Sequence, residues 1–133
     1  MNAILSDATK TTPKIAIDPA NNVFQISGES RPENASKFYS PIINLLEEYR
    51  NELISKKKPG AAKKLNFDFN FEYFNSTSAK FILDIFFQLE KFKKEGFDTE
   101  IIWRYDKRDT DMKESGEEFS KYVPEMPVKY VEY

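Results

Sequence analysis

Three consecutive hydroxyl side chains, Ser76, Thr77 and Ser78, follow Asn75 at the junction of two strongly apolar segments. A serine or threonine hydroxyl can carry a phosphoryl group, which adds about −1.5 to −2 charges at pH 7. The position also suits helix capping, because Asn75 or Ser76 could accept a hydrogen bond from an orphan backbone N–H. The two interpretations are compatible, since a phosphate at a helix N-terminus meets unpaired N–H groups and the positive end of the helix dipole.

Most other kinds of reaction centre are poorly represented in the 133 residues. The chain has no histidine, which excludes triads that use one. It has no cysteine, which removes disulfides, thiolate metal sites and a cysteine nucleophile together. Its 4 glycines lie far apart, so no glycine loop can cradle a phosphate. We therefore expect no catalytic residues, no cofactor and no enzymatic activity.

Two clusters of charged residues are better explained as solvated or helix-stabilising side chains than as binding sites. The acidic cluster lacks the central glycine of a calcium loop, and acids around the first turn of a helix interact well with its dipole, so we expect no metal site. The basic cluster has no interleaved aromatic residues for stacking on bases, which favours a solvated linker. The acidic cluster comprises Asp106, Asp109, Asp111, Glu114, Glu117 and Glu118, and the basic one Lys56, Lys57, Lys58, Lys63 and Lys64.

The overall charge is nearly balanced, with 20 Lys and Arg against 22 Asp and Glu. No global field therefore favours nucleic acid or an acidic membrane surface. No apolar run approaches the roughly 20 residues that a bilayer span requires. The N-terminus lacks the basic and apolar regions of a secretory signal. These features predict a cytoplasmic protein that binds neither nucleic acid nor membrane.

The elements that position the hydroxyl run can be read from the apolar pattern. Residues 1–11 are small and polar and are expected to form a flexible tail, and residues 12–133 a single domain. Residues 65–74 alternate, with Leu65, Phe67, Phe69, Phe71 and Tyr73 on one side, which predicts a strand. Apolar residues then recur at helical spacing up to Gly96. The hydroxyl run thus joins a strand to a helix.

The remaining chain adds elements of both kinds. Turn residues at 19–22 separate two short strands and predict a hairpin. A helix follows, with Ser30 and Glu33 as a capping box, Pro41 either restarting or kinking it, and its end near Lys56. A strand at 99–105, a helix at 109–122 and a strand at 128–133 complete the order ββαβαβαβ. This order predicts an α/β fold with one mixed, mostly parallel sheet and right-handed crossover helices.

Several spaced motifs lie along the chain. They are Gly28-Glu29-Ser30-x-Pro32-Glu33-Asn34-Ala35, Phe38-Tyr39-x-Pro41, Tyr73-Phe74-Asn75 with hydroxyl residues and Lys80, Trp103-x-Tyr105, and Asp109-x-Asp111-Met112-x-Glu114-x-Gly116-Glu117. Together these motifs resemble the SiaC family of bacterial regulatory phosphoproteins. The resemblance runs from about Thr12 to the C-terminus, and the joint occurrence of the motifs makes chance agreement improbable.

The resemblance implies a STAS-like fold, similar to anti-sigma-factor antagonists, and a partner-switching cycle. A serine/threonine kinase would phosphorylate the chain, a PPM-type phosphatase would reverse this, and the unmodified form would bind and activate an output protein such as a diguanylate cyclase, which in the family controls biofilm formation through c-di-GMP. The family acceptor follows the Asn directly and is a threonine, so by position the acceptor here is Ser76, with Thr77 the second candidate. Arg31 stands where the family more usually has an aromatic residue.

The predicted partner-binding surface comprises Phe74, Asn75, Ser76, Thr77, Ser78 and Lys80. Phosphorylation of Ser76 would decide whether this surface can bind its partner. The alternative is a constitutive interaction scaffold in which the same surface binds a partner and Ser76 is only a helix cap.

Overall fold

The computed structural model describes residues 2–56 and 63–133 and forms one six-stranded sheet. Strand order follows the chain, β1 to β6. The first three strands are antiparallel neighbours, and β3 to β6 run parallel. This confirms the predicted α/β class and the mixed, mostly parallel sheet. The strands are β1 (Ile4–Ser6), β2 (Lys14–Asp18), β3 (Val23–Ser30), β4 (Leu65–Phe74), β5 (Thr99–Tyr105) and β6 (Val128–Glu132).

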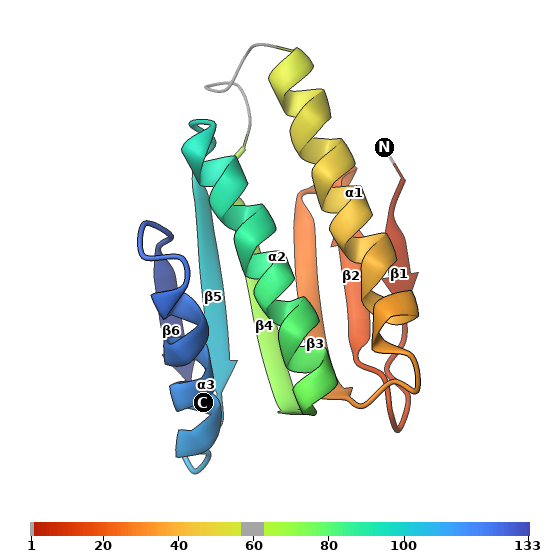
Figure 1. Cartoon of the computed structure of the whole chain (residues 1–133), viewed down its shortest axis with the longest axis vertical. Helices are drawn as coiled ribbons and strands as arrows, with labels where there is room; N and C mark the ends of the chain where they lie inside the picture. Colours follow the sequence, from red (N-terminus) through yellow and green to blue (C-terminus); the bar gives the residue numbers. More distant parts are fainter. Residues whose placement is uncertain (1, 57–62) are drawn as a thin grey trace.

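Three helices connect the parallel strands and lie on the same face of the sheet, as Figure 1 shows. They are α1 (Ala35–Ser55), α2 (Ser76–Lys94) and α3 (Thr110–Lys121), and a short 3-10 helix, η1 (Pro19–Asn21), turns the hairpin. Parallel strands in sequential order require crossovers of one hand, which places all their helices on one side. Pro41 lies inside α1, so it does not restart the helix. No helix of the described residues is long and apolar enough to cross a membrane.

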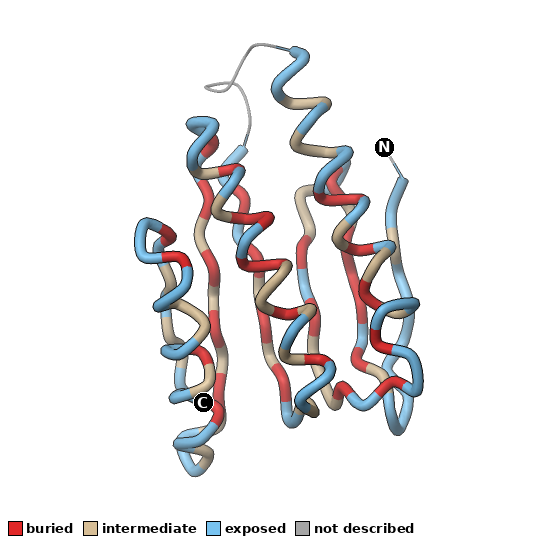
Figure 2. Tube along the Cα trace, in the orientation of Figure 1, coloured by how far each residue is buried: buried red, intermediate tan, exposed pale blue. Residues whose placement is uncertain are grey.

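The hydrophobic core lies between the helices and the sheet, where Figure 2 shows the buried positions. Phe67, Phe69 and Phe71 of β4 are buried and face it, as the alternating pattern predicts. Trp103 of β5 is buried among them and donates from Nε1 to the Met112 carbonyl at 2.9 Å. The opposite face of the sheet has no helix over it among the described residues and is mainly polar; Arg104, for example, donates to Asp68 at 2.9 Å.

The end of β4 departs from the predicted alternation. Gly28 of β3 pairs with Phe71, but the next residue, Glu29, pairs with Tyr73, so Glu72 is an extra residue in β4. A bulge of this kind reverses which side chains face the core beyond it. Tyr73 is therefore 47% exposed, and Phe74 packs inward instead. The prediction that Tyr73 shares the buried face was wrong.

The N-terminal segment, predicted as a flexible tail over residues 1–11, contains a short strand. Ile4–Ser6 forms β1 and pairs antiparallel with β2, with Ile4 opposite Ile17. The strand is only 3 residues long, too short for alternation to reveal it in the sequence. Further along, the Arg31 N–H donates to the Thr11 carbonyl at 2.6 Å. Ile4–Ser6 and Thr11 are thus hydrogen-bonded to neighbouring strands or their ends.

Candidate functional site

The junction between β4 and α2 is closed by a side-chain cap. Asn75 is the N-cap residue, with extended backbone, and its Oδ1 accepts from the Ser78 N–H at 2.9 Å. The sequence left the cap open between Asn75 and Ser76, and the structure assigns it to Asn75. Ser76 is the first residue of α2 and is exposed. Its side chain therefore has no capping role.

The three hydroxyls that follow Asn75 differ in their surroundings. The Ser76 hydroxyl is exposed and makes no hydrogen bond to any other described residue. The Thr77 hydroxyl is exposed but donates to Asn75 Oδ1 at 3.0 Å. Ser78 is fully buried. An incoming phosphoryl donor could approach Ser76 without breaking any of these bonds, could approach Thr77 only by breaking one, and could not approach Ser78.

Ser78 belongs to a buried hydroxyl network that joins three elements. Its Oγ donates to the Ser30 carbonyl at 3.2 Å and accepts from Ser30 Oγ at 2.9 Å. Ser30 Oγ also lies 2.5 Å from the hydroxyl of Tyr39 on α1. Burial raises the pKa of Tyr39 from 10.0 to about 12, and its bonds to Ser30 and Ser78 oppose the rise only in part. The network holds the start of α2 against both β3 and α1.

The prediction that Ser30 caps α1 was wrong. Ser30 is the last residue of β3, and Asn34 caps α1 by accepting from the Lys37 N–H at 3.0 Å. A serine followed three residues later by a glutamate satisfies the capping-box pattern. The pattern takes no account of burial, and the burial of Ser30 is what determines its role here. Ser30 is 0% exposed and directs its hydroxyl toward Ser78 and Tyr39.

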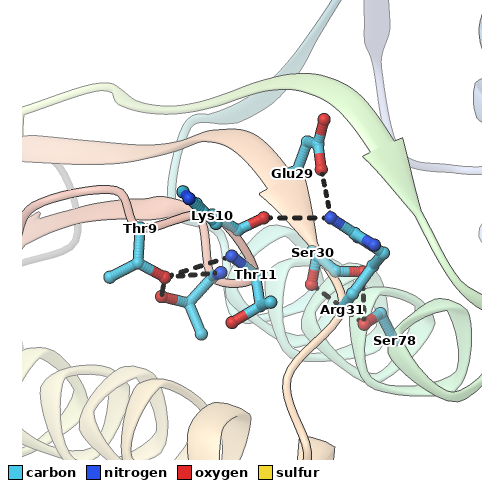
Figure 3. Close-up of polar contacts among 8 residues, drawn as sticks. Thr9, Lys10, Thr11, Glu29, Ser30, Arg31 and Ser78 are labelled. Atoms are coloured by element: carbon cyan, nitrogen blue, oxygen red, sulfur yellow. Dashed lines mark hydrogen bonds and ion pairs between the residues drawn. The ribbon is translucent and has the colours of Figure 1, made fainter.

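Arg31 lies directly beyond this network, at the end of β3. Its Nη2 donates to the Lys10 carbonyl at 3.1 Å and to a Glu29 carboxylate oxygen at 3.0 Å, as Figure 3 shows. The backbone of the neighbouring Ser30 accepts from the Asn75 N–H at 3.1 Å. The segment around Lys10, the end of β3 and the start of α2 therefore meet at the end of the sheet where β3 and β4 terminate.

The two outer members of the predicted surface are placed differently. Phe74 is half-buried, and its ring centroid lies 5.6 Å from that of Phe71. Lys80 is exposed, with its Nζ 5.4 Å from the centroid of the Phe81 ring. The predicted surface is thus one contiguous stretch of chain, but Ser78 faces inward and Phe74 only partly outward, which leaves Ser76, Thr77 and Lys80 as its exposed side chains.

Two of the acidic residues beyond β5, Asp106 and Asp109, have structural partners. Asp109 caps α3 by accepting from the Met112 N–H at 3.0 Å. Asp106 accepts from the Arg108 backbone N–H at 2.8 Å and from its guanidinium, which holds the pKa of that carboxyl well below its usual range. Among residues 2–56 and 63–133, no cluster of three or more acidic side chains is arranged to hold a metal ion. Of the basic cluster, Lys57 and Lys58 lie outside the described residues.

Sequence reasoning did not assign the network's inner members, Ser30 and Tyr39, to the site. Tyr39 lies at helical spacing with the buried Ile42 and Leu46, so its pattern indicates core packing alone. The available signal was chemical: a buried tyrosine hydroxyl needs a hydrogen-bond partner, and hydroxyl side chains at 30 and 78 can supply one.

The fold over nearly the whole chain is that of a regulatory phosphoprotein. The chain belongs to the SiaC family of regulatory phosphoproteins, whose profile matches residues 6–133. It is 30% identical over 111 residues to an uncharacterized protein of Pseudomonas aeruginosa (strain UCBPP-PA14), covering 84% of this chain and 82% of the relative.

Solved structures of Pseudomonas aeruginosa proteins share the fold over the full length. Apo-SiaC superposes with a TM-score of 0.82 at 25% identity, covering 98% of this chain and 99% of that chain. A second match is the crystal structure of the diguanylate cyclase SiaD in complex with its activator SiaC, with a TM-score of 0.80, 25% identity and full coverage of both chains. The homologue is thus a regulatory activator that forms a complex with a cyclase.

Proposed function

We propose that the chain is a non-enzymatic partner switch, in which reversible phosphorylation of Ser76 controls binding to an output protein of the diguanylate cyclase type. The observation that supports the proposal is that neighbouring residues at the start of α2 have different structural roles. Asn75 supplies the cap and Ser78 the buried anchor, which leaves the exposed Ser76 hydroxyl without a structural task. A serine/threonine kinase and a PPM-type phosphatase are its expected modifying enzymes.

Phosphate at Ser76 would change the surface without unfolding the helix. The first residue of a helix offers unpaired N–H groups and the positive end of the helix dipole, both of which favour an anion. The added charge of about −1.5 to −2 would appear beside Thr77 and Lys80, on the surface expected to contact the partner. Binding would weaken because a close interface would have to desolvate the phosphate.

The structure allows a sharp test of the acceptor. Protein purified from its native cell is measured by intact mass, and the modified peptide is mapped, for wild type, Ser76→Ala and Thr77→Ala. We expect a species heavier by one phosphate that disappears in Ser76→Ala and persists in Thr77→Ala. Ser36→Ala is a matched control, because Ser36 is an exposed hydroxyl in the first turn of α1, behind an asparagine cap. Loss of the phosphate in Thr77→Ala alone would transfer the role to Thr77.

A constitutive scaffold is the second candidate. In that case the same surface binds its partner whether or not Ser76 carries phosphate, although the cap itself belongs to Asn75. Titration of the cell's own diguanylate cyclase with the phosphorylated and unphosphorylated forms separates the two functions. Equal affinity for both forms would favour the scaffold.

A further inference from the structure

A groove with an apolar floor and an acidic side lies between the start of α2 and α3. Its volume is about 430 Å³, within the range of cavities that enclose a ligand group or several side chains. The floor comes from the end of β4, the first turn of α2 and the last turns of α3, and the acidic side from α3 alone. The lining residues are Phe74, Ala79, Asp111, Glu114, Ser115, Glu118 and Phe119.

The floor of the groove is preformed. The rings of Phe74 and Phe119 lie 5.7 Å apart, and each meets the Trp103 ring edge-on. Trp103 fixes α3 closely against the sheet because Gly116 has no side chain: a Cβ there would lie 2.5 Å from Trp103 Cδ1. A partner side chain would therefore meet a rigid apolar surface and would not have to create it.

The acidic side is uniform in charge. Asp111, Glu114 and Glu118 are exposed and recur at a spacing of three and four residues, which places them on one face of α3. Glu118 accepts from Lys121 Nζ at 2.8 Å, but both side chains are largely exposed. Within the described parts of the chain, Asp111 and Glu114 form no ion pair. The nearest lysine in sequence, Lys113, lies over the Tyr105 ring at 5.9 Å.

We propose that this groove binds a basic amphipathic helix of a partner protein. Bulky apolar side chains of that helix would pack on Phe74 and Phe119, and its Lys or Arg side chains would pair with Asp111 and Glu114. A helix suits the groove because its apolar floor lies between two helices, with Ala79 on α2 and Phe119 on α3. The acidic side repels an anionic membrane or a nucleic acid, which selects a cationic segment.

Ser76, the proposed phosphorylation site, does not line the groove but lies one helical turn before Ala79 on α2. The groove shares only Phe74 with the predicted partner-binding surface. A phosphate on Ser76 would add negative charge beside the acidic side, so the attraction of a basic helix would persist or increase. Such a surface suits a partner that must bind the phosphorylated form. The output protein, in contrast, is expected to dissociate when Ser76 is phosphorylated. The inference thus adds a second docking surface to the proposed function.

The test uses the full chain and a fluorescently labelled synthetic amphipathic helix of about 18 residues, with leucines on one face flanked by arginines. A control peptide carries glutamate in place of each arginine. We expect saturable binding of the basic peptide only, weakened by salt. The double variant Asp111→Lys, Glu114→Lys should lose about tenfold or more in affinity, while Glu117→Lys, an exposed acid of α3 outside the groove, should lose little.

Several outcomes would overturn the inference. These are absence of binding, equal binding of both peptides, or an equal loss in the Glu117→Lys variant, provided that thermal melts show all variants folded. A concentration-dependent dimer in sedimentation that the double variant abolishes would assign the groove to a second copy of the chain instead. Ser76→Ala should leave peptide binding unchanged while abolishing phosphorylation, so this inference and the phosphorylation switch fail independently.

Discussion

The starts of α1 and α2 are built from the same parts but are used differently. Each has an asparagine cap that accepts from the N–H three residues on, at 3.0 Å for Asn34 and 2.9 Å for Asn75. In α1 the first residue, Ala35, is buried and the second, Ser36, is exposed. In α2 the first two residues are exposed hydroxyls and the third, Ser78, is buried and bonded. The asparagine cap is thus common to both helices. Of these two helix starts, only that of α2 has a buried, hydrogen-bonded serine beside exposed hydroxyls.

The largest difference between the two helix starts is expected when their serines are removed. Ser78→Ala deletes a buried hydroxyl that bonds Ser30 twice, so it should lower the free energy of unfolding by about 1–3 kcal/mol. Ser36→Ala removes an exposed hydroxyl and should stay within about 0.5 kcal/mol of wild type. Denaturant titrations of both variants measure this. Equal, small changes would show that the buried network contributes nothing to stability.

Burial of the Tyr39 hydroxyl, which contacts the α2 start through Ser30, raises its pKa and so gives the stability of the protein a pH dependence. The folded pKa of Tyr39 is raised from 10.0 to about 12, so its contribution is fully present below pH 10 and is lost as pH rises from 10 to 12. The loss should approach roughly 1.4 kcal/mol per pH unit within that window. Unfolding midpoints measured from pH 9 to 11.5 should fall less steeply for Tyr39→Phe than for wild type. Tyr122→Phe, at an exposed tyrosine, is the control and should follow wild type.

The sequence predicts elements better than it predicts what their ends do. The alternation of Phe67, Phe69 and Phe71 identified β4 because three successive core positions leave little ambiguity. Because of the bulge at Glu72, Phe74 and not Tyr73 faces the core. No local sequence pattern indicates the bulge, because the bulge depends on the register between β4 and β3. Long-range register is also what assigns Ser30 to the network, since its partner Ser78 is 48 residues away.

For the candidate site, too, the sequence predicted the position of the residues but not their surroundings. Position after a strand and before a helix was enough to select Ser76, Thr77 and Ser78 as a group. It could not separate them, because their exposure depends on how α2 packs against β3 and α1. A helix turns by about 100° per residue, so consecutive hydroxyls point in different directions, and only the docked helix decides which one faces inward.

The two asparagine caps should contribute similarly to the free energy of unfolding. Asn75→Ala and Asn34→Ala each remove one side-chain acceptor from a helix start and should each cost about 0.5–2 kcal/mol. Asn75→Ala also frees the Thr77 hydroxyl, which donates to Asn75 Oδ1 in the wild type. We therefore expect phosphate at Thr77 to rise in Asn75→Ala and not in Asn34→Ala, as measured by peptide mapping after treatment with the cognate kinase. An unchanged ratio of sites would mean that this bond does not protect Thr77.

The smallest expected change in stability carries the sharpest functional consequence. Ser76→Asp places an acid in the first turn of α2, where it complements the helix dipole by about 0.3–1 kcal/mol, so the melting temperature should hold or rise slightly. Binding to the output protein should nevertheless weaken, because the partner would meet a charge where it needs close packing. Ser36→Asp places the same charge at the start of α1 and should give the same stability with unchanged binding.

A carboxylate has less charge and fewer acceptor oxygens than a phosphate, so Ser76→Asp should fall between the unmodified and phosphorylated proteins in affinity. The measurement is a titration of the output protein with wild type, Ser76→Ala, Ser76→Asp and Ser36→Asp, with thermal melts in parallel. Equal weakening by both aspartates would point to general charge repulsion and would remove the distinction between the two helix starts. Weakening by Ser76→Asp alone, at constant melting temperature, would locate the switch at the first residue of α2.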